Sequence, residues 1–529
     1  MSSFAGTAAL TRLALRRDRV VLVVFVLVLV VMVAASASAT VKLYPTEASR
    51  VKAAAAIDSS TATLAMYGPI YDKTSVGALS TFKMGIMGAV AVAILALFVV
   101  VRHTRAEEET GRLELLGATV VGRRAPLTAA LIVAGGASLV AGAGSALGLI
   151  AVGLPVAGSV LMGLGFACLG IVFAAVAGVT AQLVKSARSA AGLAGVVLGV
   201  FYLVRAIADA ATGLGWLSWL SPVGWWQQMR PFAGDRWWAL ALPLAAAVVL
   251  AALAYVLASR RDFAAGLLPD RPGPAAAAAS LRSPLALAWR LQRGSFFAWA
   301  AAFAVIGVVF GGLASNVGSF LTSPQARAFI TKLGGEQGIR DAFLATELGM
   351  AAVAAAVYGV QAALRLRTEE SALRTEPLLA TAVGRTRWAL SHLVIALAGS
   401  AMLLVIVGVT AGLVGARQTG DGGQIGRLVV AALVQIPAAW LVIGIVAAVF
   451  GLAPRWVVLG WVALTAFVLI GEFGALFNLS QAVMDVSPFA HVPRLPGGEF
   501  AVAPLLWLTA IAACLIGVGL AGFRRRDVG

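Results

Sequence analysis

The chain has 529 residues, of which 60% are hydrophobic and 12% charged, whereas soluble proteins carry about 25% charged residues. This composition excludes an ordinary soluble enzyme and predicts an integral membrane protein. The net charge of +17 does not indicate nucleic-acid binding, because the basic residues gather in alternate loops, as the positive-inside rule expects of cytoplasmic loops. Cys168 and Cys514 fall in apolar runs and the three histidines lie far apart, so neither a disulfide framework nor a metal site is expected.

Long apolar runs extend through the chain, and a run of about 20 residues can cross a bilayer as a helix. Runs this long do not fit the alternating strands of a membrane barrel. The predicted fold is therefore an all-α integral membrane protein with about twelve transmembrane helices, and both termini are cytoplasmic. The predicted spans are 20–39, 84–101, 126–150, 156–182, 190–212, 237–258, 296–315, 347–364, 388–413, 428–451, 456–475 and 502–522.

The first span follows Arg16-Arg17-Asp18-Arg19 and precedes Ala35-Ser36-Ala37, a pattern that resembles a signal peptide with its cleavage site. The apolar run is long enough to span, so we interpret it as the first transmembrane helix. The preceding residues, Ala8 to Arg17, mix apolar and basic positions and are expected along the inner membrane surface.

A charged segment follows the second span at residues 105–123, RAEEETGRLELLGATVVGR, and returns at 367–385 as RTEESALRTEPLLATAVGR. The two copies align without a gap, and 11 of 19 positions are identical. Glu108 precedes Arg112 by four residues, and Glu370 and Arg374 repeat this pair, which favours a helix. The alternative is a solvated loop whose charges serve topology alone, but topology requires arginine rather than paired glutamates.

Two further patterns recur at nearly the same spacing, a Ser-Pro pair and a closing Arg-Arg-Asp triplet. Ser221-Pro222 returns as Ser487-Pro488, and the triplet at 260–262 returns at 525–527. The sequence therefore predicts a six-span unit duplicated in the same orientation, with halves at 1–262 and 283–529 and a Pro- and Ala-rich cytoplasmic linker at 263–282. Parallel repeats of this kind are typical of transporters whose pathway lies between the halves.

The sequence holds little chemistry of its own. None of the six lysines follows a glycine, so a Walker A phosphate loop is absent and we do not expect an enzyme. Asp209 and Glu472 are the only plausible acids within the predicted spans, where acids often mark proton pathways. Because Arg205 lies four residues before Asp209, a local ion pair is an equally good interpretation. Six tryptophans between 216 and 238 predict an aromatic belt at the outer membrane surface.

The paired R-x-E-E-x-x-x-R-x-E segments, the Leu15-Arg16-Arg17 and Leu291-Gln292-Arg293 stretches before the first span of each half, and the two closing triplets carry a resemblance. Over nearly its full length the chain resembles the fused, two-repeat permease of the type-2 ABC exporters, a group associated with export of polyketide antibiotics of the tetronasin type in actinobacteria. Within that family the charged segment is a coupling helix that docks on a separate ATPase subunit.

The resemblance implies two copies of an ATP-binding-cassette ATPase as partners, which would hold ATP and Mg, so that this chain needs no cofactor. The implied docking residues are Glu107, Glu108, Arg112, Glu114, Glu369, Glu370, Arg374 and Glu376. The copies differ where Pro377 replaces Leu115. Proline removes a helix hydrogen bond, so the second helix is expected to start or bend there, which leaves the equivalence of the two docking sites open.

The resemblance also implies a drug pathway between the second and fifth spans of each half. Flexible methionines and flat aromatic rings suit varied apolar ligands, although plain helix packing or lipid contact is an alternative for each residue. The candidate residues are Met84, Met87, Phe98, Tyr202, Arg205, Asp209, Tyr358, Gln361, Phe467 and Glu472.

The predicted function is that of the permease subunit of an ATP-driven multidrug exporter in the cell membrane, where it contacts lipids and confers antibiotic resistance. Its cargo is expected to be amphipathic, such as antibiotics and other drugs. One alternative is an ion-coupled twelve-span secondary transporter, although the Gly-x-x-x-Asp-Arg pattern of that class is missing from the loop after the second span. The others are a membrane scaffold that transports nothing and an ABC exporter of envelope lipid or glycan.

Overall fold

The computed structural model describes residues 2–58, 61–117, 120–211, 213–262, 265–268, 275–314, 335–473 and 480–527. Across these residues the chain forms α-helices and short 3-10 turns without a strand, which confirms the predicted all-α fold. Eleven described helices are long and apolar enough to cross a membrane. The remaining predicted span, 456–475, corresponds to α20 (Leu459–Phe473), which has 15 residues.

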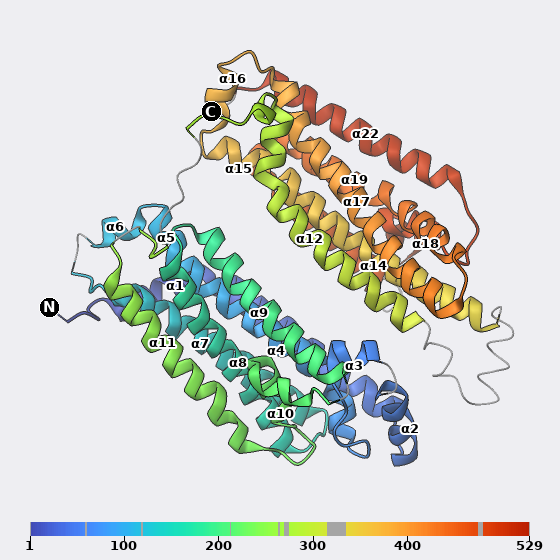
Figure 1. Cartoon of the computed structure of the whole chain (residues 1–529). Helices are drawn as coiled ribbons and strands as arrows, with labels where there is room; N and C mark the ends of the chain where they lie inside the picture. The colour runs from blue at the N-terminus through green and yellow to red at the C-terminus, as the bar shows by residue number, and fades with distance from the viewer. Residues whose placement is uncertain are drawn as a thin grey trace. The chain divides into compact units, whose positions relative to one another are not determined.

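The chain divides into two compact units, Met1–Gly273 and Pro274–Gly529. The division falls within the predicted linker, 263–282. Each unit is a bundle of long helices that run beside one another (Figure 1). We call the end of each bundle that carries the charged segment its charged end, and the opposite end its far end.

The first unit is built around α8, whose side chains are mostly buried and which packs against α4, α7 and α11. Small residues allow the close approach, as membrane helices commonly require: a Cβ atom at Gly142 would lie 2.1 Å from the carbonyl oxygen of Gly163. The long helices are α1 (Thr7–Leu43), α4 (Val76–His103), α7 (Ala125–Ala151), α8 (Val156–Leu183), α9 (Ala187–Ala210) and α11 (Ala241–Arg260). Shorter ones are α2 (Glu47–Asp58), α3 (Thr61–Tyr67) and α10 (Pro222–Gln228).

Helix α1 has 37 residues and includes Ala8 to Arg17 without a break, so this stretch continues the first span instead of forming a separate surface segment. The helix also carries a buried acid, Asp18, whose carboxylate lies 2.6 Å from His103 Nε2 and 3.2 Å from Arg102 Nη2. Asp341 and Glu347 likewise lie within α14, a helix of spanning length. The expectation that Asp209 and Glu472 are the only acids in the spanning helices was therefore incomplete.

Among the residues that the structure describes, the long helices of the second unit follow the same order, with a break in the fourth. Its long helices are α12 (Pro284–Ala314), α14 (Gly335–Ala363), α17 (Arg385–Thr419), α20 and α22 (Val502–Arg525). In place of one helix like α8 it has α18 (Gly423–Leu433) followed by α19 (Ile436–Leu452). Pro437 is the second residue of α19, where a missing N–H is tolerated because the helix is just starting.

The serine of each repeated Ser-Pro pair makes the same hydrogen bond in both units. The Ser221 hydroxyl donates to the carbonyl of Phe201 at 2.7 Å, and the Ser487 hydroxyl donates to the carbonyl of Phe467 at 3.1 Å. Each serine therefore ties the segment after the fifth span back onto that span. The equal spacing of donor and acceptor in the two units supports the alignment of the repeats at this end.

Candidate functional site

The charged segment forms two short helices in each unit, with a turn between them. In the first unit these are α5 (Arg105–Glu109) and α6 (Arg112–Gly117), and Gly111 between them has φ of 73°. In the second unit they are α15 (Arg365–Ser371) and α16 (Thr375–Leu379). Leu373 occupies the position equivalent to Gly111 and also has a positive φ, 55°, which is costly for leucine. Both copies therefore make the same turn.

This turn changes the expected ion pairs. Arg112 lies 3.6 Å from Glu107, and Arg374 lies 3.8 Å from Glu369. The predicted pairs Glu108–Arg112 and Glu370–Arg374 were wrong, because a continuous helix is needed to bring residues four apart together. Pro377 falls in the first turn of α16, where its missing N–H does no harm.

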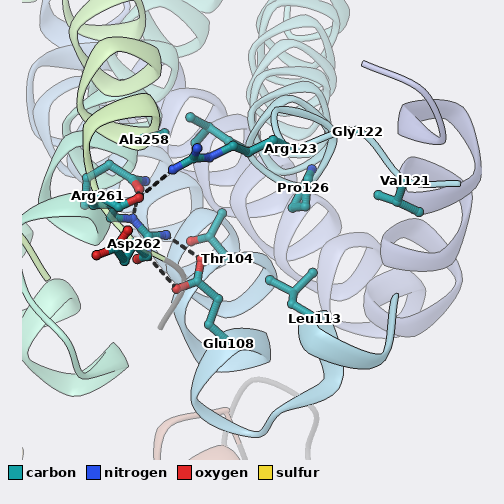
Figure 2. Close-up of a pocket in the computed structure, with 12 residues that line it drawn as sticks. Thr104, Glu108, Leu113, Val121, Gly122, Arg123, Pro126, Ala258, Arg261 and Asp262 are labelled. Atoms are coloured by element: carbon teal, nitrogen blue, oxygen red, sulfur yellow. Dashed lines mark hydrogen bonds and ion pairs between the residues drawn. The ribbon is translucent and has the colours of Figure 1, made fainter. Parts of the chain in front are cut away.

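Glu108 holds the end of α11, the last helix of the first unit, in place. The two terminal nitrogens of Arg261 donate hydrogen bonds to the two carboxylate oxygens of Glu108, and one of these bonds is 3.0 Å long (Figure 2). Arg123 donates to the main-chain oxygen of Arg261 at 2.5 Å. We call Glu108, Arg123 and Arg261 the first clamp. It is reinforced by Arg105, which is 1% exposed and contacts both Glu108 and the carbonyl of Val184.

The second unit has the same arrangement at the equivalent positions. Arg526 donates to the two oxygens of Glu370 at 2.6 and 2.9 Å. Arg385 donates to the main-chain oxygen of Arg526 at 2.7 Å. We call Glu370, Arg385 and Arg526 the second clamp. In both units, then, the closing arginine is held by its side chain and by its main chain.

All six clamp residues recur in the sequence as part of the repeat, but the glutamates were expected to take part in docking and the arginines had no expected role. The signal was present, since Arg123 and the central arginine of the closing triplet recur in both halves. What could not be read was that residues 153 and 156 positions apart meet in space.

The eight implied docking residues therefore separate into two groups. Glu107, Glu108, Glu369 and Glu370 face their own unit, and their side chains are at most 13% exposed. Glu107 also pairs with Arg17 of α1 at 2.7 Å. The exposed group is Arg112, Glu114, Arg374 and Glu376. Only this second group is available to contact a partner.

A groove lies beside the clamp in each unit. In the first unit it has a volume of about 420 Å³, and Leu113, Val121, Gly122 and Arg123 line it together with the clamp (Figure 2). In the second unit a groove of about 380 Å³ is lined by Glu376, Leu379, Val383, Gly384 and Arg385. The sequence Val-Gly-Arg contributes to both grooves at equivalent repeat positions.

The cargo candidates of the first unit occupy three kinds of environment. Met84 and Met87 are partly buried against the core, whereas Phe98 is 59% exposed. Arg205 is fully buried, pairs with Asp209 at 3.2 Å and donates to the carbonyl of Ala65 at 2.7 Å. The Tyr202 hydroxyl donates to the carbonyl of Met66 at 2.6 Å. The local ion pair that the sequence suggested is thus present, and the hydrogen bonds of Arg205 and Tyr202 connect α9 to α3.

The candidates of the second unit are also dispersed. Tyr358 is 1% exposed and packs among Phe296 and Trp299 in the core. Gln361 is exposed and accepts a hydrogen bond from Trp299 at 3.0 Å. Phe467 is half-buried. Glu472 lies in α20, but its side chain is outside the described residues.

A cavity of about 890 Å³ lies at the far end of the second unit, between α14, α20 and the segment after α20. Its walls include Met350, Met484 and Phe489, together with the buried Asp341 and Gln435. Asp341 is ion-paired with Arg427 through one oxygen, and among the described residues its other oxygen has no hydrogen-bond partner. The sequence prediction named none of these residues.

The first unit is filled at the equivalent place, where the described cavity beside Trp226 has about 50 Å³. Trp226 and Phe232 are 6% and 8% exposed and pack against glycines of α4 and α8. At the 266-residue spacing that relates Ser221 to Ser487, their counterparts are Val492 and Gly498. Val492 and Gly498 both line the larger cavity of the second unit. Trp226, predicted at a membrane surface, is instead part of the core.

Comparison with known proteins identifies the family. A domain model described as "Multidrug efflux system permease Rv1217c, C-terminal domain" matches the chain twice, at residues 9–257 and 281–524. The chain is also 47% identical over 530 residues to "Multidrug efflux system permease protein Rv1217c" of Mycobacterium tuberculosis (strain ATCC 25618 / H37Rv), covering 100% of this chain and 96% of that protein. Together with the eleven apolar helices, these matches show that the chain is a multi-pass membrane protein that belongs to the Rv1217c family of multidrug efflux permeases.

Proposed function

We propose that this chain is the membrane subunit of an ATP-driven exporter of amphipathic compounds, and that separate ATPase subunits dock on its two charged segments. The observation that carries the proposal is the repetition of one surface: each unit presents an exposed arginine and glutamate, Arg112 with Glu114 and Arg374 with Glu376, on a segment braced from behind. Two equivalent surfaces suit two copies of one partner.

The source of energy follows from what the chain lacks. No lysine follows a glycine anywhere in the sequence, so the usual phosphate-binding loop of an ATPase has to come from a partner. That partner would supply ATP and Mg, and this chain would act as a transport subunit rather than an enzyme. The excess of basic residues near the charged ends favours a cytoplasmic location for these ends and for both termini.

Asymmetry at the far ends supports a cargo route that involves the second unit. The cavity of about 890 Å³ falls in the size range of sites for drug-like molecules. Its methionine and phenylalanine walls would accept varied apolar groups, while Asp341 and Gln435 offer hydrogen-bond acceptors. The relative from Mycobacterium tuberculosis is named a multidrug efflux permease, which agrees with a route of mixed polarity. Phe98 and Gln361, both exposed on the second span of their unit, remain candidates for the same route.

The decisive experiment is co-purification with an ABC ATPase encoded beside this gene, followed by ATP hydrolysis and drug export in lipid vesicles. The variant to use is Arg112→Glu with Arg374→Glu, because both side chains are exposed and a charge reversal there should leave the fold intact. Glu108 and Glu370 are unsuitable, since changing them breaks the clamps.

A matched control is Lys52→Glu with Arg417→Glu, which reverses two exposed charges away from the charged segments. We expect the docking variant, and not the control, to lose the ATPase and drug-stimulated hydrolysis. If no ATPase binds the unaltered chain, yet vesicles that hold it alone move drug in response to a proton gradient, the chain is an ion-coupled carrier instead.

A further inference from the structure

We infer that Arg261 and Arg526 are positioning residues that carry movement of the charged segment to the last helix of each unit. The inference rests on the proposed function, because it assumes that a partner moves the segment. The second span leads directly into the charged segment and would move with it. Through the clamp, the last span moves with the segment as well.

The first step is the geometry of the contact. In each clamp a planar guanidinium faces a planar carboxylate and two nitrogens meet two oxygens, at 2.6 and 2.9 Å in the pair of Arg526 with Glu370. A two-point contact fixes orientation as well as distance. The glutamate therefore cannot rotate or shift without taking the arginine with it.

The second step is that each closing arginine is also held through its main chain. Arg123 donates to the carbonyl of Arg261, and Arg385 donates to the carbonyl of Arg526. Both donors stand at the start of the third span of their unit, beside α7 and in α17. The charged segment, the start of the third span and the end of the last span thus meet at one residue.

The last helix of each unit, α11 or α22, lies at the edge of its bundle (Figure 1). Few side chains of α11 and α22 are buried inside their units, and these helices rest mainly on α8 and α19 respectively. The helices α19 and α22 come into close contact, because a Cβ atom at Gly451 would lie 1.9 Å from the carbonyl oxygen of Gly519. The clamp adds an oriented ion pair at the end of the last helix and so ties that end to the charged segment.

Both units keep the clamp although the residues around it differ. Arg261 donates to the side chain of Gln182 at 2.5 Å. The guanidinium of Arg526 instead lies over two rings, 5.0 Å from the centre of Phe450 and 5.1 Å from that of Phe523. Two copies of the unit have changed the neighbours and kept the contact, which is expected if the contact itself has a task.

The test uses the full chain in complex with its ATPase in lipid vesicles and measures drug exported per ATP hydrolysed. Arg261→Lys with Arg526→Lys keeps both charges but removes the two-point contact. Because each lysine keeps a positive charge beside its glutamate, we expect the ATPase still to bind, and export per ATP to fall about tenfold, within the usual range of coupling between distant sites. The control is Arg260→Ala with Arg525→Ala, exposed neighbours in the same triplets, which should export normally.

A comparison of single and double variants distinguishes mechanics from stability. Glu108→Gln and Arg261→Lys each remove the two-point contact of the first clamp, so making both changes together removes no further contact. We expect the double variant to export as much per ATP as the weaker single variant, because residues that act through one another have non-additive effects. The inference is overturned if the lysine variants assemble and couple like the unaltered chain, or if the control variants lose coupling to the same extent. Either result leaves ATPase docking standing, whereas failure of the unaltered chain to bind any ATPase removes the proposed function itself.

Discussion

The two units are alike at their charged ends and unlike at their far ends. At the charged end both place a glutamate, a third-span arginine and a closing arginine in the same arrangement. At the far end, the described residues of the first unit, Trp226 and Phe232 among them, leave a cavity of about 50 Å³, whereas those of the second unit line one of about 890 Å³. This difference agrees with the proposed function, in which one kind of partner would contact both charged ends and cargo would use one far end.

The charged ends also differ in how they hold the clamp. In the first unit Glu108 lies between two arginines, Arg105 and Arg261, whose side chains are 1% and 10% exposed. In the second unit Arg367 lies 3.4 Å from Glu370 and is 35% exposed, so water shares its charge. Aromatic rings beneath Arg526 compensate there. The first clamp therefore depends more strongly on its glutamate.

The largest expected effect comes from emptying the filled far end. Trp226→Val removes a buried ring whose centre lies 6.1 Å from the centre of the Phe166 ring and which packs against Gly85 and Gly165. We expect the free energy of unfolding to fall by about 3–5 kcal/mol, the usual cost of truncating a buried aromatic side chain. An unfolding titration in mixed micelles measures this. A loss below about 1 kcal/mol would contradict the packed far end, since even modest core truncations cost that much.

The next effect compares the glutamates of the two clamps. Glu108→Ala leaves two buried arginines without a carboxylate partner, so we expect a loss of about 3 kcal/mol, at the lower end of the range for broken buried pairs. Glu370→Ala should cost less, about 2 kcal/mol, because Arg526 keeps its contact with the two aromatic rings. Such cation–π contacts stabilise by about 0.5 to 2 kcal/mol each. The same titration compares them, and equal losses would mean that the surroundings do not matter.

A smaller effect is expected from filling the hollow far end. Val492→Trp introduces in the second unit the side chain that the first unit has at this place, beside a cavity of about 890 Å³. Export of bulky cargo should fall about tenfold, equivalent to about 1.4 kcal/mol, while ATPase binding stays unchanged. Val492→Leu serves as the control. Unaltered export in the tryptophan variant would show that cargo does not use this cavity.

The smallest effect concerns the turn within the charged segment. Leu373 has φ of 55°, which costs a leucine about 1 kcal/mol or more. Leu373→Gly should therefore raise the free energy of unfolding by about 1 kcal/mol, whereas Gly111→Leu should lower it by a similar amount. Measuring both variants in parallel removes common effects of the lipid or detergent. A glycine at 373 that destabilises the chain would mean that the leucine side chain makes contacts that outweigh its strain.

The sequence alone determined the features that depend on local composition. Eleven apolar helices lie where long apolar runs predicted them, because the main chain has to satisfy its own hydrogen bonds in lipid and a helix does so within one segment. The duplication was equally clear, since identical residues at a fixed spacing need no three-dimensional information. Both features also led to the correct family.

Only the tertiary structure decided which charges face inward. Glu108 and Glu114 look equally suited to docking in the sequence, yet one is clamped to Arg261 and the other is exposed. The difference depends on a partner 153 residues away and on the turn at Gly111, neither of which any local pattern encodes. Likewise, whether a far end is filled or hollow depends on how side chains from several helices occupy one volume. Packing of that kind is a property of the assembled bundle.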